Sequence, residues 1–441
     1  MTSEVATVAF SPDETSILTT SDDNTIRLWG ASDGTLLREF TGHTPSPLSV
    51  AFSPDNLKII TGAKAPDNTM RLWDIASGNI IKQFHGHTNA ISSVAFSPDG
   101  TKILTGSLDS TAQLWDAASG AKIASFKGHT NEISSVAFSP NSKKIITGSY
   151  DSSVCLWSVD SQSLIRKLAV DSGAITAVAF SSDGNKIATG SWAYRFKKFD
   201  RRARVWDVIT GDLIMSSSTY SSDVSSVAFS SDGTKLLTSS GWNYNAVATI
   251  WNIESGDTIW QPTRDSSSLL SKYAAFSPDN SYILTGGESQ NLLLWDVTNQ
   301  TIIKTIIIDP FEINSLAFSH DGAMISTGAS DGIVRLWNLR DTSSVKRPVN
   351  VANTSTGFRL YAAERNVLVF RVPSQSDLLP STMLHLYTSN GVLVGKYSGI
   401  PESKGTISFH LTCGLGRGAY ICRFVTSRTS ARSDQMIVIC K

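Results

Sequence analysis

The sequence predicts an all-β protein: a β-propeller of eight four-stranded blades, followed by a small immunoglobulin-like β-sandwich. The first observation is an apolar triplet that ends in phenylalanine. Val94-Ala95-Phe96 is one example, and this triplet or a close variant of it recurs eight times. The second is a tryptophan that follows each triplet. These tryptophans recur every 42 to 49 residues and are Trp29, Trp73, Trp115, Trp157, Trp206, Trp251, Trp295 and Trp337. A regular period of this length indicates stacked structural repeats.

One repeat, residues 91–126, shows why each unit should be an antiparallel meander. Its expected strands are Ile91–Phe96, Lys102–Ser107, Thr111–Asp116 and Lys122–Phe126. The first two are joined by Ser97-Pro98-Asp99-Gly100, whose residue types suit a type I turn. The inner strands are apolar on both faces, so both faces must be covered. Identical sheets arranged around an axis cover each other in this way, which gives one blade per repeat.

Composition excludes several classes of protein. The chain of 441 residues is 41% hydrophobic and 17% charged, as expected of a folded protein. Lys+Arg and Asp+Glu are equal at 38 each, so the chain has no overall field for nucleic acid, and nucleic-acid binding is not expected. No apolar run is long enough for a transmembrane segment, and Met1 to Leu18 does not resemble a secretory signal.

The residues of the repeat resemble those of the WD-repeat propellers, whose units carry Gly-His before the first strand and Trp-Asp after the third. The Gly-His signature is matched by Gly42-His43, Gly86-His87 and Gly128-His129. The Trp-Asp signature is matched by Trp73-Asp74, Trp115-Asp116, Trp206-Asp207 and Trp295-Asp296. The resemblance covers residues 4–341 and implies an eight-bladed WD-repeat propeller.

The resemblance also implies a buried relay of four side chains within a blade. In blade 2 these are His43, Thr61, Asp67 and Trp73; in blade 3 His87, Thr105, Asp109 and Trp115; in blade 4 His129, Thr147, Asp151 and Trp157. Blades 5 and 7 lack parts of the set. A hydroxyl, an imidazole and a carboxylate together could suggest a nucleophilic triad. A set that recurs in every blade is better explained as a way to satisfy buried polar groups.

The sequence therefore predicts no enzyme, with no catalytic residues and no cofactor. No glycine-rich phosphate loop occurs, and no His or Cys spacing suits a metal site.

Departures from the repeat indicate where function could lie, because insertions fall on loops. Blades 2, 5 and 6 lengthen the connection from the second to the third strand, and all three loops should lie on one rim. The loops of blades 5 and 6 are aromatic and basic, which is typical of binding hot spots. The candidate partner-binding residues are Trp192, Tyr194, Arg195, Phe196, Lys197, Lys198, Phe199, Arg201, Arg202, Trp242 and Tyr244. The alternative is a solvated loop whose aromatic side chains fold back onto the blade.

Residues 342–357 should supply an outer strand of blade 8 and a linker. The candidate strand is Val345–Val351, where Pro348 is tolerable at a sheet edge. Because Glu4–Phe10 is already the innermost strand of blade 1, we expect blade 8 to consist of C-terminal chain only. The seam between blades 8 and 1 should then rely on side-chain packing alone.

Residues 358–441 contain seven short alternating runs without the tryptophan period, and Ser389-Asn390-Gly391 suggests a hairpin turn. This piece resembles the C-terminal sorting domains of bacterial proteins secreted by the type IX system. The matching stretches are Leu384–Gly391, Gly418-Ala419-Tyr420-Ile421 and the closing strand to Cys440. An Asn-Pro opening is absent. The resemblance implies an extracellular or cell-surface protein whose N-terminus is truncated; otherwise an adhesion-like sandwich in a cytoplasmic protein is expected.

The sequence thus favours a monomeric, non-catalytic protein–protein interaction scaffold that engages a protein partner through the rim of blades 5 and 6. The alternative is a secreted or surface-attached propeller that binds a glycan through the same aromatic loops.

Overall fold

A computed structural model describes most of the propeller and, beyond it, the strands of the C-terminal part. The described residues are 4–169, 173–192, 201–218, 220, 222–241, 247–261, 272–287, 291–307, 312–339 and, after these, the strands between 359 and 440. The chain divides into two compact units, residues 3–351 and residues 352–441. No helix in the described part is long and apolar enough to cross a membrane.

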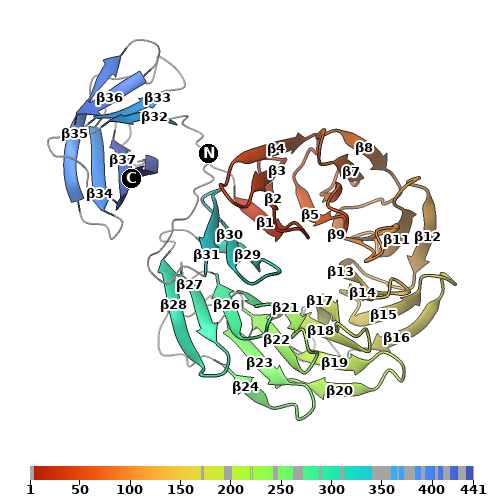
Figure 1. The fold of residues 1–441 in the computed structure, drawn as a ribbon. Helices are drawn as coiled ribbons and strands as arrows, with labels where there is room; N and C mark the ends of the chain where they lie inside the picture. The colour runs from red at the N-terminus through yellow and green to blue at the C-terminus, as the bar shows by residue number, and fades with distance from the viewer. Residues whose placement is uncertain are drawn as a thin grey trace. The chain divides into compact units, whose positions relative to one another are not determined.

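The first unit is an eight-bladed β-propeller, with its sheets arranged around a central axis (Figure 1). Blades 1 to 4 are β1 (Val5–Phe10), β2 (Ser16–Ser21), β3 (Thr25–Gly30), β4 (Leu36–Thr41); β5 (Pro47–Phe52), β6 (Lys58–Ala63), β7 (Met70–Asp74), β8 (Ile80–Phe84); β9 (Ile91–Phe96), β10 (Lys102–Ser107), β11 (Thr111–Asp116), β12 (Lys122–Lys127); and β13 (Ile133–Phe138), β14 (Lys144–Ser149), β15 (Ser153–Ser158), β16 (Leu164–Ala169).

Blades 5 to 8 continue the same order. They are β17 (Ala174–Phe180), β18 (Lys186–Trp192), β19 (Ala203–Asp207), β20 (Leu213–Ser216); β21 (Val224–Phe229), β22 (Lys235–Ser240), β23 (Val247–Asn252), β24 (Thr258–Trp260); β25 (Tyr273–Phe276), β26 (Tyr282–Gly286), β27 (Asn291–Asp296), β28 (Thr301–Ile307); and β29 (Ile313–Phe318), β30 (Met324–Ala329), β31 (Val334–Asn338). Seven blades have four antiparallel strands, and blade 8 has three among its described residues.

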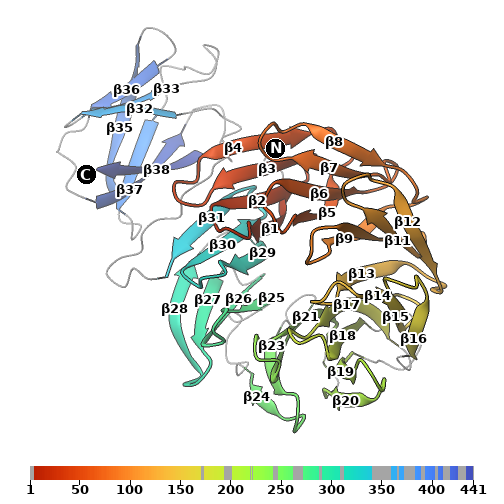
Figure 2. The ribbon, with the colours of Figure 1, turned by 45° about the vertical axis from the view of Figure 1, so that its right-hand side comes forward.

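The loops of each blade emerge at two opposite ends, which places related residues on the same face. One end carries the connections from the fourth strand to the next blade and from the second to the third strand; we call it the relay face. The other carries the turns from the first to the second strand and from the third to the fourth, and we call it the turn face. Figure 2 shows the ring obliquely, turned by 45° from the view of Figure 1. The expected turn Ser97–Gly100 lies on the turn face, closed by a hydrogen bond from the Gly100 amide to the Ser97 carbonyl (2.8 Å).

The core lies between neighbouring sheets, as apolar inner strands require. One cluster joins Ile60 and Leu72 of blade 2 to Ile91 and Trp115 of blade 3, all 4% exposed or less. Close approach of sheets explains a glycine near the end of the second strand. A Cβ atom on Gly328 of blade 8 would lie 2.5 Å from Cγ1 of Val5 in blade 1.

The seam between blades 8 and 1 does not rely on side-chain packing alone, so that expectation is wrong. The Val8 amide of blade 1 donates to Ser315 Oγ of blade 8 at 3.1 Å. The same bond joins the Val94 amide to Ser49 Oγ, also at 3.1 Å, between blades 2 and 3. The ring therefore closes with a bond that other seams also use, because Ser315 of β29 occupies the same position in its inner strand as Ser49 of β5.

The second unit contains the seven strands β32 (Arg359–Glu364), β33 (Val367–Arg371), β34 (Met383–Thr388), β35 (Leu393–Glu402), β36 (Thr406–His410), β37 (Gly418–Val425) and β38 (Asp434–Cys440). They hydrogen-bond in the order β32-β33-β36-β35-β34-β37-β38. The N-terminal half of β35 pairs with β34 and its C-terminal half with β36. The immunoglobulin-like sandwich and the sorting-domain resemblance remain predictions for this unit. The expected outer strand Val345–Val351 lies outside the described residues.

Candidate functional site: the relays and the rim of blades 5 and 6

The relay of blade 3 connects four side chains from two strands, β10 and β11, and from the two loops that precede β9 and β11. His87 Nδ1 lies 2.8 Å from Asp109 Oδ2, and its Nε2 lies 2.8 Å from Thr105 Oγ1. Trp115 Nε1 donates to Thr105 Oγ1 at 3.1 Å. Because an indole N–H can only donate, the hydroxyl accepts from Trp115 and donates to Nε2. The remaining imidazole proton is then on Nδ1 and is donated to the carboxylate.

The structure brings the corresponding residues of blades 2 and 4 together in the same way. In blade 2, His43 Nδ1 lies 2.9 Å from Asp67 Oδ2 and its Nε2 lies 2.7 Å from Thr61 Oγ1, which accepts from Trp73 at 2.9 Å. In blade 4, His129 lies 3.1 Å from Asp151 Oδ2 and 2.7 Å from Thr147, which accepts from Trp157 at 3.0 Å.

The aspartates of the relays remain ionised. Burial raises the pKa of Asp109, but hydrogen bonds from His87, Thr111 and the Thr88 amide outweigh it and hold the pKa well below its usual range. The pKa of Asp151 is lowered for the same reasons. Burial lowers the pKa of His43, more than Asp67 raises it, so the neutral imidazole is favoured. These protonation states agree with the proton positions inferred from the hydrogen bonds.

The relays cannot present a nucleophile. The hydroxyl-bearing residues Thr61, Thr105 and Thr147 are 0% exposed, so no substrate atom can reach them. Each hydroxyl also already accepts one hydrogen bond and has a partner for its proton. No group of three or more His, Cys, Asp or Glu side chains in the described part of the chain could hold a metal ion.

Blade 6 contains a relay that the sequence reasoning missed. Tyr220 lies four residues before β21, as His87 lies four residues before β9. Its hydroxyl lies 2.6 Å from Thr238 Oγ1 and accepts from Trp251 Nε1 at 2.7 Å. Burial raises the pKa of Tyr220 to about 12, so the phenol stays neutral. The spacing of Tyr220 from the next strand matches that of His87, but only histidine was expected at this position of the repeat.

Blades 1 and 8 place an arginine ion pair on the relay face. Arg27 Nη2 lies 2.8 Å from Asp23 Oδ2, and its Nε lies 2.8 Å from Glu39 Oε2. Arg335 Nη2 lies 2.5 Å from Asp331 Oδ2. Both arginines are four residues after their aspartate, so they occupy equivalent positions in the two blades.

The base of the blade 5 loop contacts both neighbouring blades. Trp192 stacks edge-on against Tyr150 of blade 4, with ring centroids 5.9 Å apart. Arg201 Nε lies 3.0 Å from Asp223 Oδ1 of blade 6. Of the other candidate contact residues, Arg202 donates its amide to Ser191 Oγ at 3.1 Å. The remaining ones, Tyr194, Arg195, Phe196, Lys197, Lys198, Phe199, Trp242 and Tyr244, lie outside the described residues.

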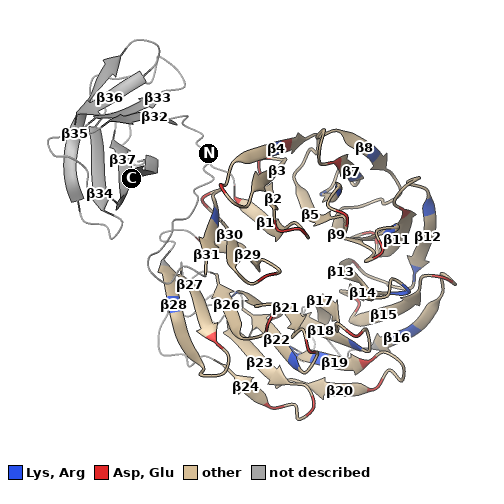
Figure 3. Cartoon of the chain, viewed as in Figure 1, with Lys and Arg blue, Asp and Glu red and all other residues tan. Residues whose placement is uncertain are grey.

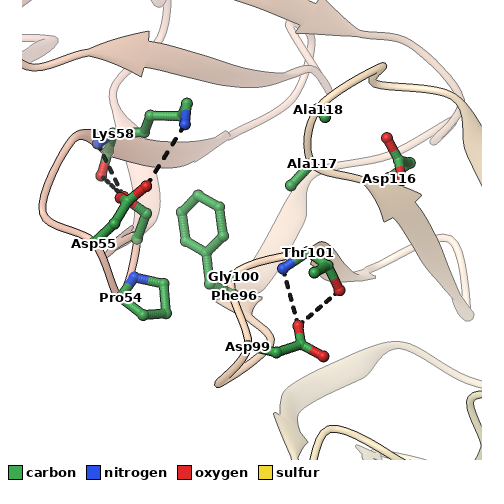
Figure 4. Close-up of a pocket in the computed structure, with 11 residues that line it drawn as sticks. Pro54, Asp55, Lys58, Phe96, Asp99, Gly100, Thr101, Asp116, Ala117 and Ala118 are labelled. Atoms are coloured by element: carbon green, nitrogen blue, oxygen red, sulfur yellow. Dashed lines mark hydrogen bonds and ion pairs between the residues drawn. The ribbon is translucent and has the colours of Figure 1, made fainter.

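A cavity of about 580 Å³ opens on the turn face between blades 2 and 3 (Figure 4). The ring of Phe96 stands between the Pro54-Asp55 turn and Ala117. The carboxylate of Asp99 there accepts hydrogen bonds from Ser97 Oγ and from the Thr101 amide and hydroxyl. These bonds outweigh burial and lower its pKa to about 2. The hydrogen bonds within the turn thus explain why an aspartate stands at this position, without a ligand in the cavity.

Two family profiles match parts of the propeller. The profile described as the IFT122 first beta-propeller matches residues 47–195. The profile of the WD domain, G-beta repeat, matches residues 2–30, 211–252, 271–296 and 303–338.

Several known proteins are similar over shorter stretches. Pre-mRNA-processing factor 19 homolog 2 of Arabidopsis thaliana is 31% identical over 108 residues, covering 24% of this chain and 20% of its own. WD repeat-containing protein 91 of Gallus gallus is 39% identical over 85 residues, 17% of this chain and 11% of its own. Anaphase-promoting complex subunit cdh1 of Dictyostelium discoideum is 30% identical over 102 residues, 23% of this chain and 13% of its own. The chain thus spans a fifth or less of these relatives.

A solved structure supports the fold. The computationally designed Ika8 protein superposes with a TM-score of 0.66 at 24% identity, covering 77% of this chain and 97% of that protein. The three relatives above are eukaryotic, so they give no support to a bacterial origin or to a sorting function of the C-terminal unit.

Proposed function

We propose that this protein, a chain of WD40 repeats folded as an eight-bladed β-propeller, is a non-catalytic scaffold for protein–protein interactions. The relays stabilise the blades, and the partner binds the rim formed by the loops between second and third strands in blades 5 and 6. One relative is named as a subunit of a complex, which agrees with a role in assembly.

The observation that carries this proposal is the anchoring of the blade 5 loop. Its first residue, Trp192, packs on blade 4, and its last part, Arg201, pairs with blade 6. Both ends of an insertion rich in aromatic and basic residues are therefore fixed by contacts to the rigid ring. Such a loop loses less conformational entropy on binding than a free one. The basic residues favour a partner with an acidic surface.

The experiment compares two lysine pairs at opposite ends of the propeller. In the rim variant, Lys197→Glu and Lys198→Glu reverse the charge of the loop. In the control variant, Lys143→Glu and Lys144→Glu make the same change in a turn of blade 4 on the turn face. We expect partners captured by the wild-type chain from its native extract to be lost from the rim variant and kept by the control. Capture by both variants would move the contact away from this rim.

The second candidate is a glycan-binding propeller, secreted or surface-attached. It rests on the aromatic residues of the same loops, including Trp192 and Trp242, and on the sorting-domain resemblance of residues 358–441. Binding of the full chain to a glycan array, lost in Trp242→Ala, would favour it over a protein partner. Without such binding, the scaffold for protein–protein interactions remains the proposal.

A further inference from the structure

The cavity on the turn face between blades 2 and 3 combines an aromatic ring with charged side chains. The half-buried ring of Phe96 stands between Pro54 of blade 2 and Ala117 of blade 3 (Figure 4). The volume of about 580 Å³ lies within the range of pockets that bind small ligands. The face of an aromatic ring offers a ligand side chain a surface on which to stack.

An alanine of blade 3 leaves this space open. Ala117 is the second residue after the tryptophan of its blade. Six other blades carry a larger aliphatic residue there: Ile75, Val159, Val208, Ile253, Val297 and Leu339. A larger side chain at this position would occupy the space beside the phenylalanine.

The turn of blade 3 adds a glycine to the same wall. Gly100 lines the cavity, whereas its counterpart in blade 4, Ser142, bonds across the seam to the Asp99 amide at 3.2 Å. Blade 1 also has the alanine, at position 31, but carries Glu14 in place of this glycine and Gly30 in place of Asp116. Among the eight repeats of the sequence, only blade 3 has alanine, glycine and aspartate at these three positions.

Three carboxylates and one ammonium group line the cavity, so its charge is negative. Lys58 Nζ lies 3.8 Å from Asp55 Oδ2, which gives that carboxylate its own cation. The other two are Asp99 and Asp116. Hydrogen bonds from the Ser119 amide and hydroxyl lower the pKa of Asp116, so it stays ionised like Asp99. Lys102 donates to Thr101 Oγ1 at 3.1 Å rather than to either carboxylate.

The turns bond to one oxygen only of Asp99 and of Asp116. The Ser97 hydroxyl and the Thr101 amide and hydroxyl all donate to Asp99 Oδ1. The Ser119 amide and hydroxyl both donate to Asp116 Oδ1. In both residues Oδ2 keeps its capacity to accept, on a side chain that the turn already orders. An ordered side chain loses little conformational entropy when a ligand binds.

A ligand of this cavity has to match an aromatic ring and ionised carboxylates together. An arginine side chain does so, because its aliphatic stem packs on apolar surface while its planar guanidinium stacks on rings and donates to carboxylates. Lysine offers a compact, strongly hydrated charge that stacks less well. A neutral apolar side chain would leave the carboxylates without a partner.

We propose that this cavity binds an arginine side chain of a basic peptide segment. The guanidinium stacks on Phe96 and is held by the Asp99 and Asp116 carboxylates. The site lies on the turn face, opposite the rim of blades 5 and 6, and does not rest on the function proposed for that rim. One anchored side chain gives a Kd on the order of 0.1 mM, which is too weak for capture from an extract.

The test uses the full chain with carbon-13 in its alanine methyl groups, titrated with the blocked peptide Gly-Ala-Arg-Ala-Gly. We expect saturable shifts of the methyl resonances of Ala117 and Ala118, which both line the cavity. A peptide with citrulline in place of arginine has nearly the same shape without the charge, and it should bind at least about tenfold more weakly. No saturable shift, or equal binding of the two peptides, overturns the proposal.

A double variant, Asp99→Asn with Asp116→Asn, removes the charge and keeps the turns. Asparagine already forms both turns elsewhere, because Asn141 Oδ1 accepts from the Ser139 hydroxyl and the Lys143 amide, and Asn252 Oδ1 from two amides. This variant should bind the arginine peptide at least about tenfold more weakly. The matched control makes the same changes in blade 5, Asp183→Asn with Asp207→Asn, and should bind like the wild type. Equal affinity of the two variants would contradict the role of the carboxylates.

Ala117→Val tests the cavity without changing a charge. Three other blades carry valine at this position, so the fold accepts it. The added methyl groups should fill the space beside Phe96 and abolish the peptide-induced shift of Ala118. A dissociation constant equal to that of the wild type would show that the peptide binds elsewhere.

Discussion

Replacement of Asp109 by alanine tests whether the relays stabilise the blades. The Asp109 carboxylate accepts hydrogen bonds from the Thr88 and Thr111 amides and the Thr111 hydroxyl, and it contacts His87 Nδ1 at 2.8 Å. Without it, the Nδ1 proton of His87, whose side chain is 1% exposed, has lost its acceptor. A buried donor without a partner costs about 1–3 kcal/mol. We expect Asp109→Ala to lower the free energy of unfolding by that amount.

The assay is denaturant unfolding followed by tryptophan fluorescence, together with hydrogen exchange at β10 and β11. Asp116→Ala is the matched control, because Asp116 accepts two hydrogen bonds in a solvent-facing turn of the same blade. Its cost should stay below about 1 kcal/mol, since water replaces the lost partner. Equal unfolding midpoints for the two variants, with unchanged exchange in β10, would refute the stabilising role of the relay.

Three further predictions concern the blades. Tyr220→Phe should cost about 1 kcal/mol of unfolding free energy, because Trp251 keeps Thr238 as acceptor; no change in the denaturant midpoint would contradict the tyrosine relay. The folded-state pKa values of Asp67 and His43 lie below their unfolded values. Stability should therefore be complete above about pH 6.5 and decline below it, because the imidazole of the unfolded chain takes up a proton more readily than His43 in the fold. It should decline further below about pH 4, where the Asp67 carboxylate behaves in the same way; urea midpoints that rise between pH 7 and 5 would contradict this. Ser315→Ala should accelerate hydrogen exchange of the Val8 amide and leave that of Val94, which bonds to Ser49, unchanged; equal rates before and after the substitution would show that this bond does not hold the seam.

The propeller could be predicted because its signals repeat. The expected strands Ile91–Phe96, Lys102–Ser107 and Thr111–Asp116 agree with β9, β10 and β11, and the fourth strand extends one residue further, to Lys127. Turn residues such as Ser97 to Gly100 mark the strand ends locally, so no long-range information was needed. The resemblance to WD repeats also brought together residues far apart in the sequence, such as His87 and Asp109.

Other features depend on contacts that no local pattern encodes. Tyr220 can take the place of the histidine because its hydroxyl reaches Thr238 from the same position. Whether a side chain reaches that far is known from the structure and not from its residue type. The hydrogen bond from Val8 to Ser315 joins the two ends of the propeller, 307 residues apart. A serine on an inner strand carries no sign of such a partner.

Charge on the propeller is spread over the ring, with lysine and arginine on outer strands such as β8, β12 and β16 (Figure 3). Several of these cations, including Arg38 and Arg166, donate to carbonyl oxygens of the next blade. They therefore serve the structure of the ring, and the rim of blades 5 and 6 remains the proposed partner site.

The most direct test of the scaffold account is a hydrogen-exchange footprint of the full chain with and without its captured partner. We expect protection on binding to be concentrated in residues 191–202, the blade 5 loop, and in residues 220–224, where Asp223 of blade 6 pairs with Arg201 of that loop. The Ser-Pro-Asp turns of the turn face, such as Ser97–Asp99, should exchange at the same rate in both states. Protection of these turns, with the blade 5 loop unchanged, would contradict the account.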